Sequence, residues 1–166
     1  YPGLGATQRL PRLIGRELAK YLIFTGEVLN ARTAHFMGLA EAVSLDELDI
    51  RIRETVPRMT TQETLILAPE LNKIKLILAD KVNDLLNGKL LNSQDKLEAK
   101  IAKKISYKAP LALKWANQII DEGLKLGLEQ GLQVELGHLE EIFSTEDAYE
   151  GLTSILERRR PTYKGM

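Results

Sequence analysis

The chain has 166 residues, with 23 basic and 23 acidic side chains, two histidines and no cysteine. This length fits about one domain of ~100–200 residues, and the 44% hydrophobic content fits a globular protein. The zero net charge disfavours a dedicated nucleic-acid binder. The absence of cysteine excludes disulfides, thiol catalysis and Cys-ligated metals. No apolar run approaches the ~18 residues that a membrane span needs, and we expect a reducing, cytoplasmic setting.

The first third of the chain follows a helical pattern. A Gly-rich loop at residues 1–7 precedes predicted helices over Gln8–Ile14 and Arg16–Phe24, which Gly15 separates. The first of these helices has Pro11 in its first turn, where proline is tolerated.

A second group of short elements follows. Asn30 is predicted to cap a helix over Ala31–Met37, which Gly38 ends. The apolar segment Leu39–Ser44 predicts a short strand, and Asp46–Thr55 predicts a further helix.

The middle of the chain contains apolar residues at helical spacings of three and four. They are Leu71, Ile74, Leu78, Val82 and Leu85. A charged amphipathic segment follows over residues 89–108. Pro110 then fits the first turn of another helix, which ends near Gly123.

Two apolar stripes predict the last helices. The first consists of Leu128, Leu132, Leu136, Leu139 and Phe143, and the second of Ala148, Leu152, Ile155 and Leu156, which we expect to be the buried face of the final helix. Ser144 and Asp147 resemble a capping box for that helix. The cluster Arg158–Arg160 is placed in its last turn, where cations complement the helix dipole, and Pro161 ends it.

Few motifs carry chemistry. The stretch Gly3–Gly5 begins like a dinucleotide-binding loop, but Gln8 stands where the third glycine would be. The loop is therefore either a plain turn or a place where a ligand approaches the backbone closely. Glu135 and His138 have the Glu-x-x-His spacing of a di-iron site, but the chain has no second such pair. We therefore predict no metal site.

Other polar groups have simpler interpretations. No serine lies in a Gly-x-Ser-x-Gly elbow, and the carboxylate pairs at positions 121–122, 140–141 and 146–147 fit a solvated helix surface. The basic run Arg158–Arg160, with Tyr163 and Lys164 after it, has two interpretations. It is either a solvated helix end or a tail that contacts phosphate through bidentate arginine donors.

Two segments far apart in the chain resemble one family. The opening, Pro2-Gly3-Leu4-Gly5-Ala6-Thr7-Gln8-Arg9-Leu10, resembles the signature of the enoyl-CoA hydratase (crotonase) family. The ending, with Phe143-Ser144-Thr145-Glu146-Asp147 and Glu157-Arg158-Arg159-Arg160-Pro161, resembles the family's C-terminal Phe-x-Thr-x-Asp and Lys-Arg-x-Pro patterns. The resemblance covers residues 1–56 and 105–166.

The resemblance implies a mainly α chain that forms the C-terminal helical part of a crotonase-type (ClpP/crotonase) α/β spiral fold. Residues 1–56 would form the end of the spiral core. Residues 57–104, longer than in a typical member, would form a helical insertion or extension. Residues 105–166 would form the helices that make trimer contacts and cover CoA.

The resemblance also implies a distribution of site residues. The family uses two glutamates and two backbone N–H donors, which form an oxyanion hole for the thioester enolate. By the resemblance these lie upstream of Pro2, so we expect a C-terminal part without hydratase activity of its own. Gly3 would face the reacting acyl group and water. Phe143, Arg158 and Lys164 would contact CoA, although Phe143 fits an apolar core equally well.

The whole protein is then expected to be an enoyl-CoA hydratase of fatty-acid β-oxidation, in which one glutamate activates water and the other supplies the proton. A fusion with a 3-hydroxyacyl-CoA dehydrogenase fits the same pattern. The expected partners are an acyl-CoA thioester as substrate and further copies of the chain, with no cofactor, nucleic acid or membrane span. Two alternatives stay open: a non-catalytic helical interaction module, and an isomerase or another crotonase-superfamily enzyme.

Overall fold

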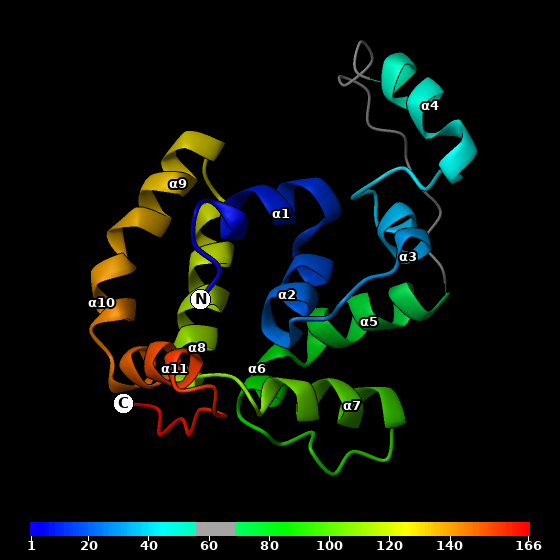
Figure 1. Cartoon of the computed structure of the whole chain (residues 1–166). Helices are drawn as coiled ribbons and strands as arrows, with labels where there is room; N and C mark the ends of the chain where they lie inside the picture. Colours follow the sequence, from blue (N-terminus) through cyan, green and yellow to red (C-terminus); the bar gives the residue numbers. More distant parts are fainter. Residues whose placement is uncertain (56–68) are drawn as a thin grey trace.

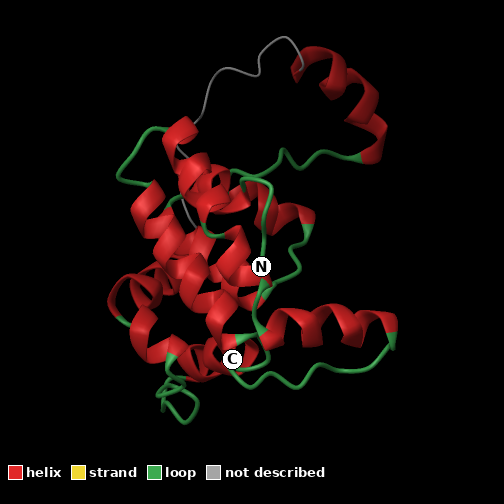
Figure 2. Ribbon diagram, turned by 90° about the vertical axis from the view of Figure 1, so that its left-hand side faces the viewer, coloured by secondary structure: helices red, strands yellow, loops and turns green. Residues whose placement is uncertain are grey.

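The computed structural model describes residues 1–55 and 69–166, and these residues form helices joined by turns (Figures 1 and 2). In chain order they are α1 (Ala6–Ile14), α2 (Arg16–Thr25), α3 (Ala31–Phe36), the 3-10 turn η1 (Leu45–Glu47), α4 (Leu48–Thr55), α5 (Pro69–Asp80), α6 (Val82–Leu86), α7 (Lys96–Ile105), α8 (Pro110–Gly123), α9 (Leu128–Gly137), α10 (Leu139–Phe143) and α11 (Glu146–Leu156). The mainly α expectation is confirmed for these residues. The α/β spiral stays a prediction.

The core lies where α2 meets α5, α7 and α8 in the centre of the molecule (Figure 1). Leu18 and Phe24 of α2 are buried against Leu78 of α5, Ile101 of α7 and Ala116 of α8. Each large apolar side chain removed from water in this way contributes about 1.5–3 kcal/mol. The core therefore joins residues from the start, the middle and the later part of the chain.

The apolar helix predicted in the middle of the chain is confirmed, with one interruption. All five of its predicted core residues are buried, but α5 ends at Asp80 and α6 begins at Val82, with Lys81 between them. The polar segment at positions 60–62 and the predicted domain boundary at residue 57 lie outside the described residues. The division of the chain at residues 57 and 104 stays a prediction.

Two expectations for the first third are wrong. The first helix begins at Ala6 rather than Gln8, so Pro11 lies beyond its first turn. The reason is the left-handed turn at Gly5, φ 82°, which starts the helix two residues early. Leu39–Ser44 forms no strand, because no described segment pairs with it and an isolated strand cannot satisfy its backbone groups.

Three local signals for the start or end of a helix are confirmed. Asn30 caps α3, since its Oδ1 accepts a hydrogen bond from Thr33 N–H at 2.8 Å. Gly38, φ 76°, follows α3 in the left-handed conformation, and the predicted stop is therefore observed. Pro110 occupies the first turn of α8, as predicted.

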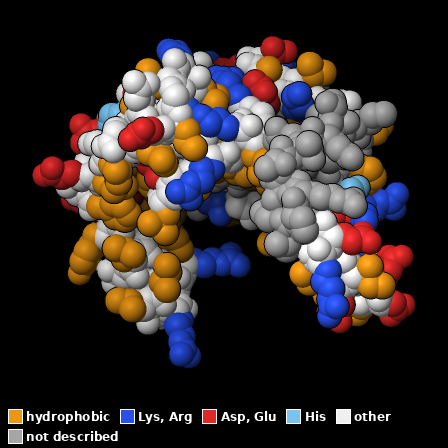
Figure 3. Space-filling view, turned by 90° about the horizontal axis from the view of Figure 1, so that it is seen from above, with side chains coloured by type: hydrophobic (Ala, Val, Ile, Leu, Met, Phe, Trp, Pro, Cys, Tyr) orange, Lys and Arg blue, Asp and Glu red, His pale blue; other side chains and the backbone are white. Residues whose placement is uncertain are grey.

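The last helices differ from expectation in what they face. α9 and α10 are separate helices that meet at His138, and α11 projects from the body with the tail, residues 157–166, folded back along it (Figure 2). The predicted buried residues Leu152, Ile155 and Leu156 are exposed, Leu156 by 83%. Their helical spacing is correct, but no described segment covers them. Figure 3 shows hydrophobic side chains concentrated on this projecting limb.

The cap of α11 is also a correction. Thr145, not Ser144, caps the helix, because Thr145 Oγ1 accepts a hydrogen bond from Ala148 N–H at 3.0 Å. The Ser144 hydroxyl instead donates to the carbonyl oxygen of Glu140 at 2.6 Å, at the end of α10.

Candidate functional site

The loop that contains Gly3 turns tightly before α1. Leu4 and Gly5 both lie in the left-handed region, with φ of 59° and 82°, and Ala6 N–H donates to the Gly3 carbonyl oxygen at 3.3 Å. A leucine in this region costs about 1–2 kcal/mol, yet the Leu4 side chain is 95% exposed and gains no packing. Among the described residues, nothing accepts a hydrogen bond from the N–H groups of Gly3 or Leu4. This geometry favours a ligand-approach loop over a plain turn.

A buried carboxylate from α9 holds the loop. The Glu135 side chain is 2% exposed, its Oε1 accepts a hydrogen bond from Gly5 N–H at 2.6 Å, and its Oε2 accepts one from the Thr7 hydroxyl. Gly5 is the N-cap of α1 and has no side chain to cap the helix, so Glu135 does so from 130 positions away. Its negative charge also faces the positive end of the α1 dipole.

The Tyr1 hydroxyl lies beside this carboxylate. Burial and, to a lesser extent, the negative charge of Glu135 raise the pKa of Tyr1 to about 12. The phenol is therefore neutral at pH 7. Glu135, which the sequence pairs with His138 as an incomplete metal motif, is used for hydrogen bonding. The described part of the chain contains no cluster of three or more His, Asp or Glu side chains that could hold a metal.

The contacts of Thr7 and Gln8 give a structural role to two residues of the opening motif. Both are fully buried, and Gln8 Nε2 donates to Thr7 Oγ1 at 3.2 Å and to the Ile119 carbonyl oxygen of α8 at 3.1 Å. The Gln8 amide fills the space between Gly123 and Gly131, where an added Cβ would come within 1.9 and 2.4 Å of Gln8 Oε1. These contacts fix α1 against α8 and α9, and so fix the end of the Gly3 loop.

Arg158 lies just beyond α11 rather than in its last turn. Its φ of 54° is left-handed, its N–H donates to the Ile155 carbonyl oxygen at 3.2 Å, and Arg159 N–H donates to the Ser154 carbonyl oxygen at 3.0 Å. These two bonds form a Schellman motif, in which glycine is the usual residue at the position of Arg158. The Arg158 side chain is exposed and has no ion pair among the described residues.

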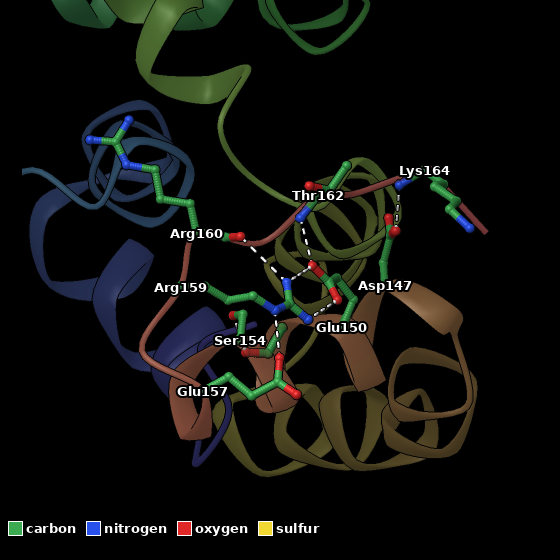
Figure 4. Close-up of polar contacts among 9 residues, drawn as sticks. Asp147, Glu150, Ser154, Glu157, Arg159, Arg160, Thr162 and Lys164 are labelled. Atoms are coloured by element: carbon green, nitrogen blue, oxygen red, sulfur yellow. Dashed lines mark hydrogen bonds and ion pairs between the residues drawn. The ribbon is translucent and has the colours of Figure 1, made fainter.

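Carboxylates of α11 bind the tail (Figure 4). Asp147 is buried and accepts hydrogen bonds from the N–H groups of Lys164 at 2.7 Å and Gly165 at 2.9 Å. Glu150 accepts one from Thr162 N–H at 2.7 Å and one from Arg159 Nη2 at 2.7 Å. The hydrogen bonds from Arg159 lower the pKa of Glu150 to about 2. The expectation that the pair at 146–147 is solvated is therefore wrong for Asp147.

The four cations of the tail, Arg158, Arg159, Arg160 and Lys164, differ in whether a carboxylate pairs with them. Arg159 is paired with Glu150 and Glu157, whereas Figure 4 shows the Arg160 side chain pointing away from this cluster. The Lys164 side chain is exposed and lines an open pocket of ≈ 430 Å³ beside Ser144. Three of the four tail cations, Arg158, Arg160 and Lys164, therefore have side chains without an ion pair in the described part of the chain.

The predicted site residues do not form one cluster. Phe143 ends α10 and is 56% exposed, so its interpretation as a core residue is wrong. Among the described residues, no hydrogen bond or ion pair joins Gly3, Phe143, Arg158 and Lys164 to one another. Their roles stay predictions. Sequence reasoning missed the roles of Glu135 and Asp147, whose partners lie far away in the chain.

Comparison of the sequence with known proteins places the chain in a family. The sequence model described as enoyl-CoA hydratase/isomerase matches residues 1–165. The chain therefore belongs to the enoyl-CoA hydratase/isomerase family, and the resemblance of its two terminal motifs is confirmed. The described residues include no helix with the length and apolar character needed to cross a membrane.

Individual relatives are similar over nearly the whole chain. Mouse mitochondrial methylglutaconyl-CoA hydratase is 30% identical over 164 residues, 99% of this chain and 39% of that protein. Crotonyl-CoA hydratase of Syntrophomonas wolfei is 28% identical over 162 residues, 98% of this chain and 45% of that protein. The crystal structure of an enoyl-CoA hydratase from Bacillus anthracis is 31% identical, with a TM-score of 0.41 over 99% of this chain and 46% of that one. The chain spans less than half the length of these relatives.

Proposed function

We propose that the chain provides the Gly3 loop and the CoA-covering helices of an enoyl-CoA hydratase. The observation that carries this proposal is the family match over residues 1–165, at less than half the length of the relatives. The catalytic glutamates and the oxyanion donors would come from sequence outside these 166 residues. One glutamate would activate water, and the other would supply the proton that completes its addition to the trans-2-enoyl thioester.

Within this reaction the chain's own groups have separate tasks. The Gly3 N–H faces the acyl group and water, and its lack of an acceptor among the described residues supports that role. Arg158 and Lys164 bind phosphates of CoA through their free charged ends, and exposed Phe143 contacts the CoA moiety. Acyl-CoA is the substrate, and no cofactor is needed. An isomerase would share these groups, so the upstream residues decide between the two reactions.

The test joins this chain behind the first half of the Bacillus anthracis enoyl-CoA hydratase, in place of that enzyme's own second half. Hydration is measured as the loss of the enoyl-thioester absorbance of crotonyl-CoA. We expect turnover by this hybrid enzyme and none by the 166-residue chain alone. Turnover by the chain alone would show that it has catalytic groups of its own. A folded hybrid that neither binds CoA nor turns over would contradict the proposal.

The exposed apolar residues of α9 to α11 favour a second, compatible role in assembly. Leu136, Phe143 and Ile155 belong to these helices, and each side chain is more than half exposed. Exposed apolar surface of this kind often marks a contact with other protein. We propose that this face packs against other protein in the complete enzyme, with copies of the same chain in a trimer as the expected partner. If binding through this face is all that the chain does, it is the non-catalytic helical interaction module named above as an alternative. A cytoplasmic location is part of the proposal.

A further inference from the structure

We propose that Glu135 is a positioning residue for the hydratase site: its carboxylate holds the Gly3 loop in the shape that presents the Gly3 N–H. This inference rests on the proposed function for the role of Gly3, but the loop contact itself is independent of it. The juxtaposition joins α9 to the loop across 130 positions of sequence.

Within the described part of the chain, Glu135 is a buried carboxylate that no cation pairs with. It is 2% exposed, and no lysine or arginine of the described residues forms an ion pair with it. Burial of an unpaired charge is unfavourable unless hydrogen bonds replace the lost water. Both of its hydrogen bonds go to the loop and the first turn of α1, from Gly5 N–H and from the Thr7 hydroxyl. The carboxylate therefore serves the loop rather than a salt bridge.

The loop needs such a support. Leu4 and Gly5 are consecutive left-handed residues, and Leu4 has no packing that would stabilise this conformation. Strain of this kind persists where the surrounding structure imposes it. The Gly5 N–H bond to Glu135 Oε1, at 2.6 Å, is the hydrogen bond next to Leu4 that anchors the loop to another helix. Without it, Leu4 can relax to a negative φ, and the Gly3–Leu4 and Leu4–Gly5 peptides turn with it. Gly3 is joined to the first of these peptides, so its own N–H then loses its fixed position.

The body of α1 has independent anchors. Gln8 is bonded to Ile119, and Arg12 donates to the carbonyl oxygens of Gly123 at 2.6 Å and Leu126 at 3.0 Å. Loss of the Glu135 carboxylate should therefore release the loop and leave α1 docked. This separation makes a local positioning role distinguishable from a general loss of stability.

The first experiment uses the 166-residue chain and hydrogen exchange of the Gly5 amide, measured by NMR. The variants are Glu135→Ala, Glu135→Gln and the control Glu129→Ala, an exposed glutamate on the same helix. We expect Gly5 exchange about 10- to 100-fold faster in Glu135→Ala, unchanged exchange in the control, and an intermediate rate in Glu135→Gln, whose amide oxygen still accepts the bond. Unchanged exchange in Glu135→Ala overturns the proposal.

The second experiment measures crotonyl-CoA hydration in the hybrid enzyme. Because the Gly3 N–H acts at the reacting group and not on CoA, Glu135→Ala should lower kcat about tenfold or more and leave KM within about twofold, with partial rescue by Glu135→Gln. A wild-type kcat in a variant with a released Gly5 amide overturns the positioning role. If Glu135→Ala does not fold, Glu135→Gln decides by the same two readouts. An inactive unsubstituted hybrid would count against the proposed function while the exchange result still tests the loop contact.

Discussion

Where α1, α8 and α9 meet, single residues of the family pattern are required by close packing. Gln8 has no exposed surface, and two glycines from different helices border its amide. Neither Gly123 nor Gly131 needs a left-handed backbone, so their small size serves the approach of Gln8. A buried amide that is held by Ile119 cannot move away without losing its hydrogen bond.

We therefore predict that Gly123→Ala lowers the free energy of unfolding by about 1–3 kcal/mol, because its Cβ overlaps the Gln8 amide. In a Gln8→Ala background the same substitution should cost less than about 1 kcal/mol, because the overlapping atoms are gone. Gly137→Ala is the matched control, since nothing lies within 4 Å of its added Cβ. Urea unfolding gives all values. Equal costs of Gly123→Ala in both backgrounds would contradict this origin.

Arg158 has an unfavourable left-handed backbone conformation and a side chain that we propose to contact CoA. Its left-handed φ of 54° is the one that glycine adopts freely, so Arg158→Gly should raise the free energy of unfolding by about 1 kcal/mol. In the hybrid enzyme the same change should weaken CoA binding about three- to tenfold, through the lost cation, whereas Arg158→Lys should retain most of the affinity. Calorimetric titration with CoA measures both variants. A more stable Arg158→Gly variant with unchanged affinity would remove Arg158 from the CoA site.

At the scale of whole elements, the projecting limb consists of α11 and the tail, residues 157–166. Two carboxylates of α11 hold the tail through hydrogen bonds to residues 12 to 18 positions away in the sequence. Asp147 and Glu150 lie one turn apart on α11 and accept hydrogen bonds from the backbone N–H groups of Thr162, Lys164 and Gly165. Tyr163 lies between Thr162 and Lys164 in the tail. Its hydroxyl packs close to Gly151 of α11, since a Cβ added at Gly151 would lie 3.3 Å from it. The tail therefore follows α11 because the helix offers acceptors, not because the tail has a structure of its own.

This arrangement predicts a pH dependence of the tail. Glu150 has an ordinary pKa of 4.5 and a folded-state pKa of about 2, lowered by Arg159. A carboxyl group with a lowered pKa stabilises the fold above its ordinary value, and this contribution is lost as the pH falls from about 4.5 to about 2. NMR should show the Glu150 carboxyl titrating near pH 2, together with the Thr162 amide. Glu150→Gln should abolish that response. A Glu150 titration near 4.5 would contradict the contact with Arg159.

The elements also show which features were predictable from sequence. The Asn30 cap, the Gly38 stop and the Pro110 start depend on residues within a few positions of each other, and all three are confirmed. The spacing of apolar residues located α5, α8 and α11 correctly as well. The roles of Glu135 and Asp147 were not predictable, because an acidic residue on a helix is most often solvated and their partners are set by the tertiary fold.

Across the whole molecule, the pattern of burial is uneven. The core around α2 is closed, whereas α11 carries its apolar side chains into solvent on a projecting limb (Figures 2 and 3). The sequence predicted this face as buried, and the spacing alone could not tell whether the cover comes from the same folded body. The difference has a direct physical meaning. A helix with an apolar stripe gains stability when that stripe is covered, so other protein surface is the expected cover.

We predict that the chain associates through this face. Sedimentation equilibrium of the 166-residue chain should show species larger than a monomer, because association removes apolar surface such as that of Ile155, which is 73% exposed, from water. Ile155→Glu and Leu156→Glu should each shift the equilibrium towards monomer without loss of helical circular dichroism, since neither side chain is buried in the fold. Leu45→Glu, at an equally exposed leucine in η1 near α4, should leave association unchanged. A chain that is monomeric at every concentration, or one in which all three variants behave alike, would show that the α11 face is not what joins the copies.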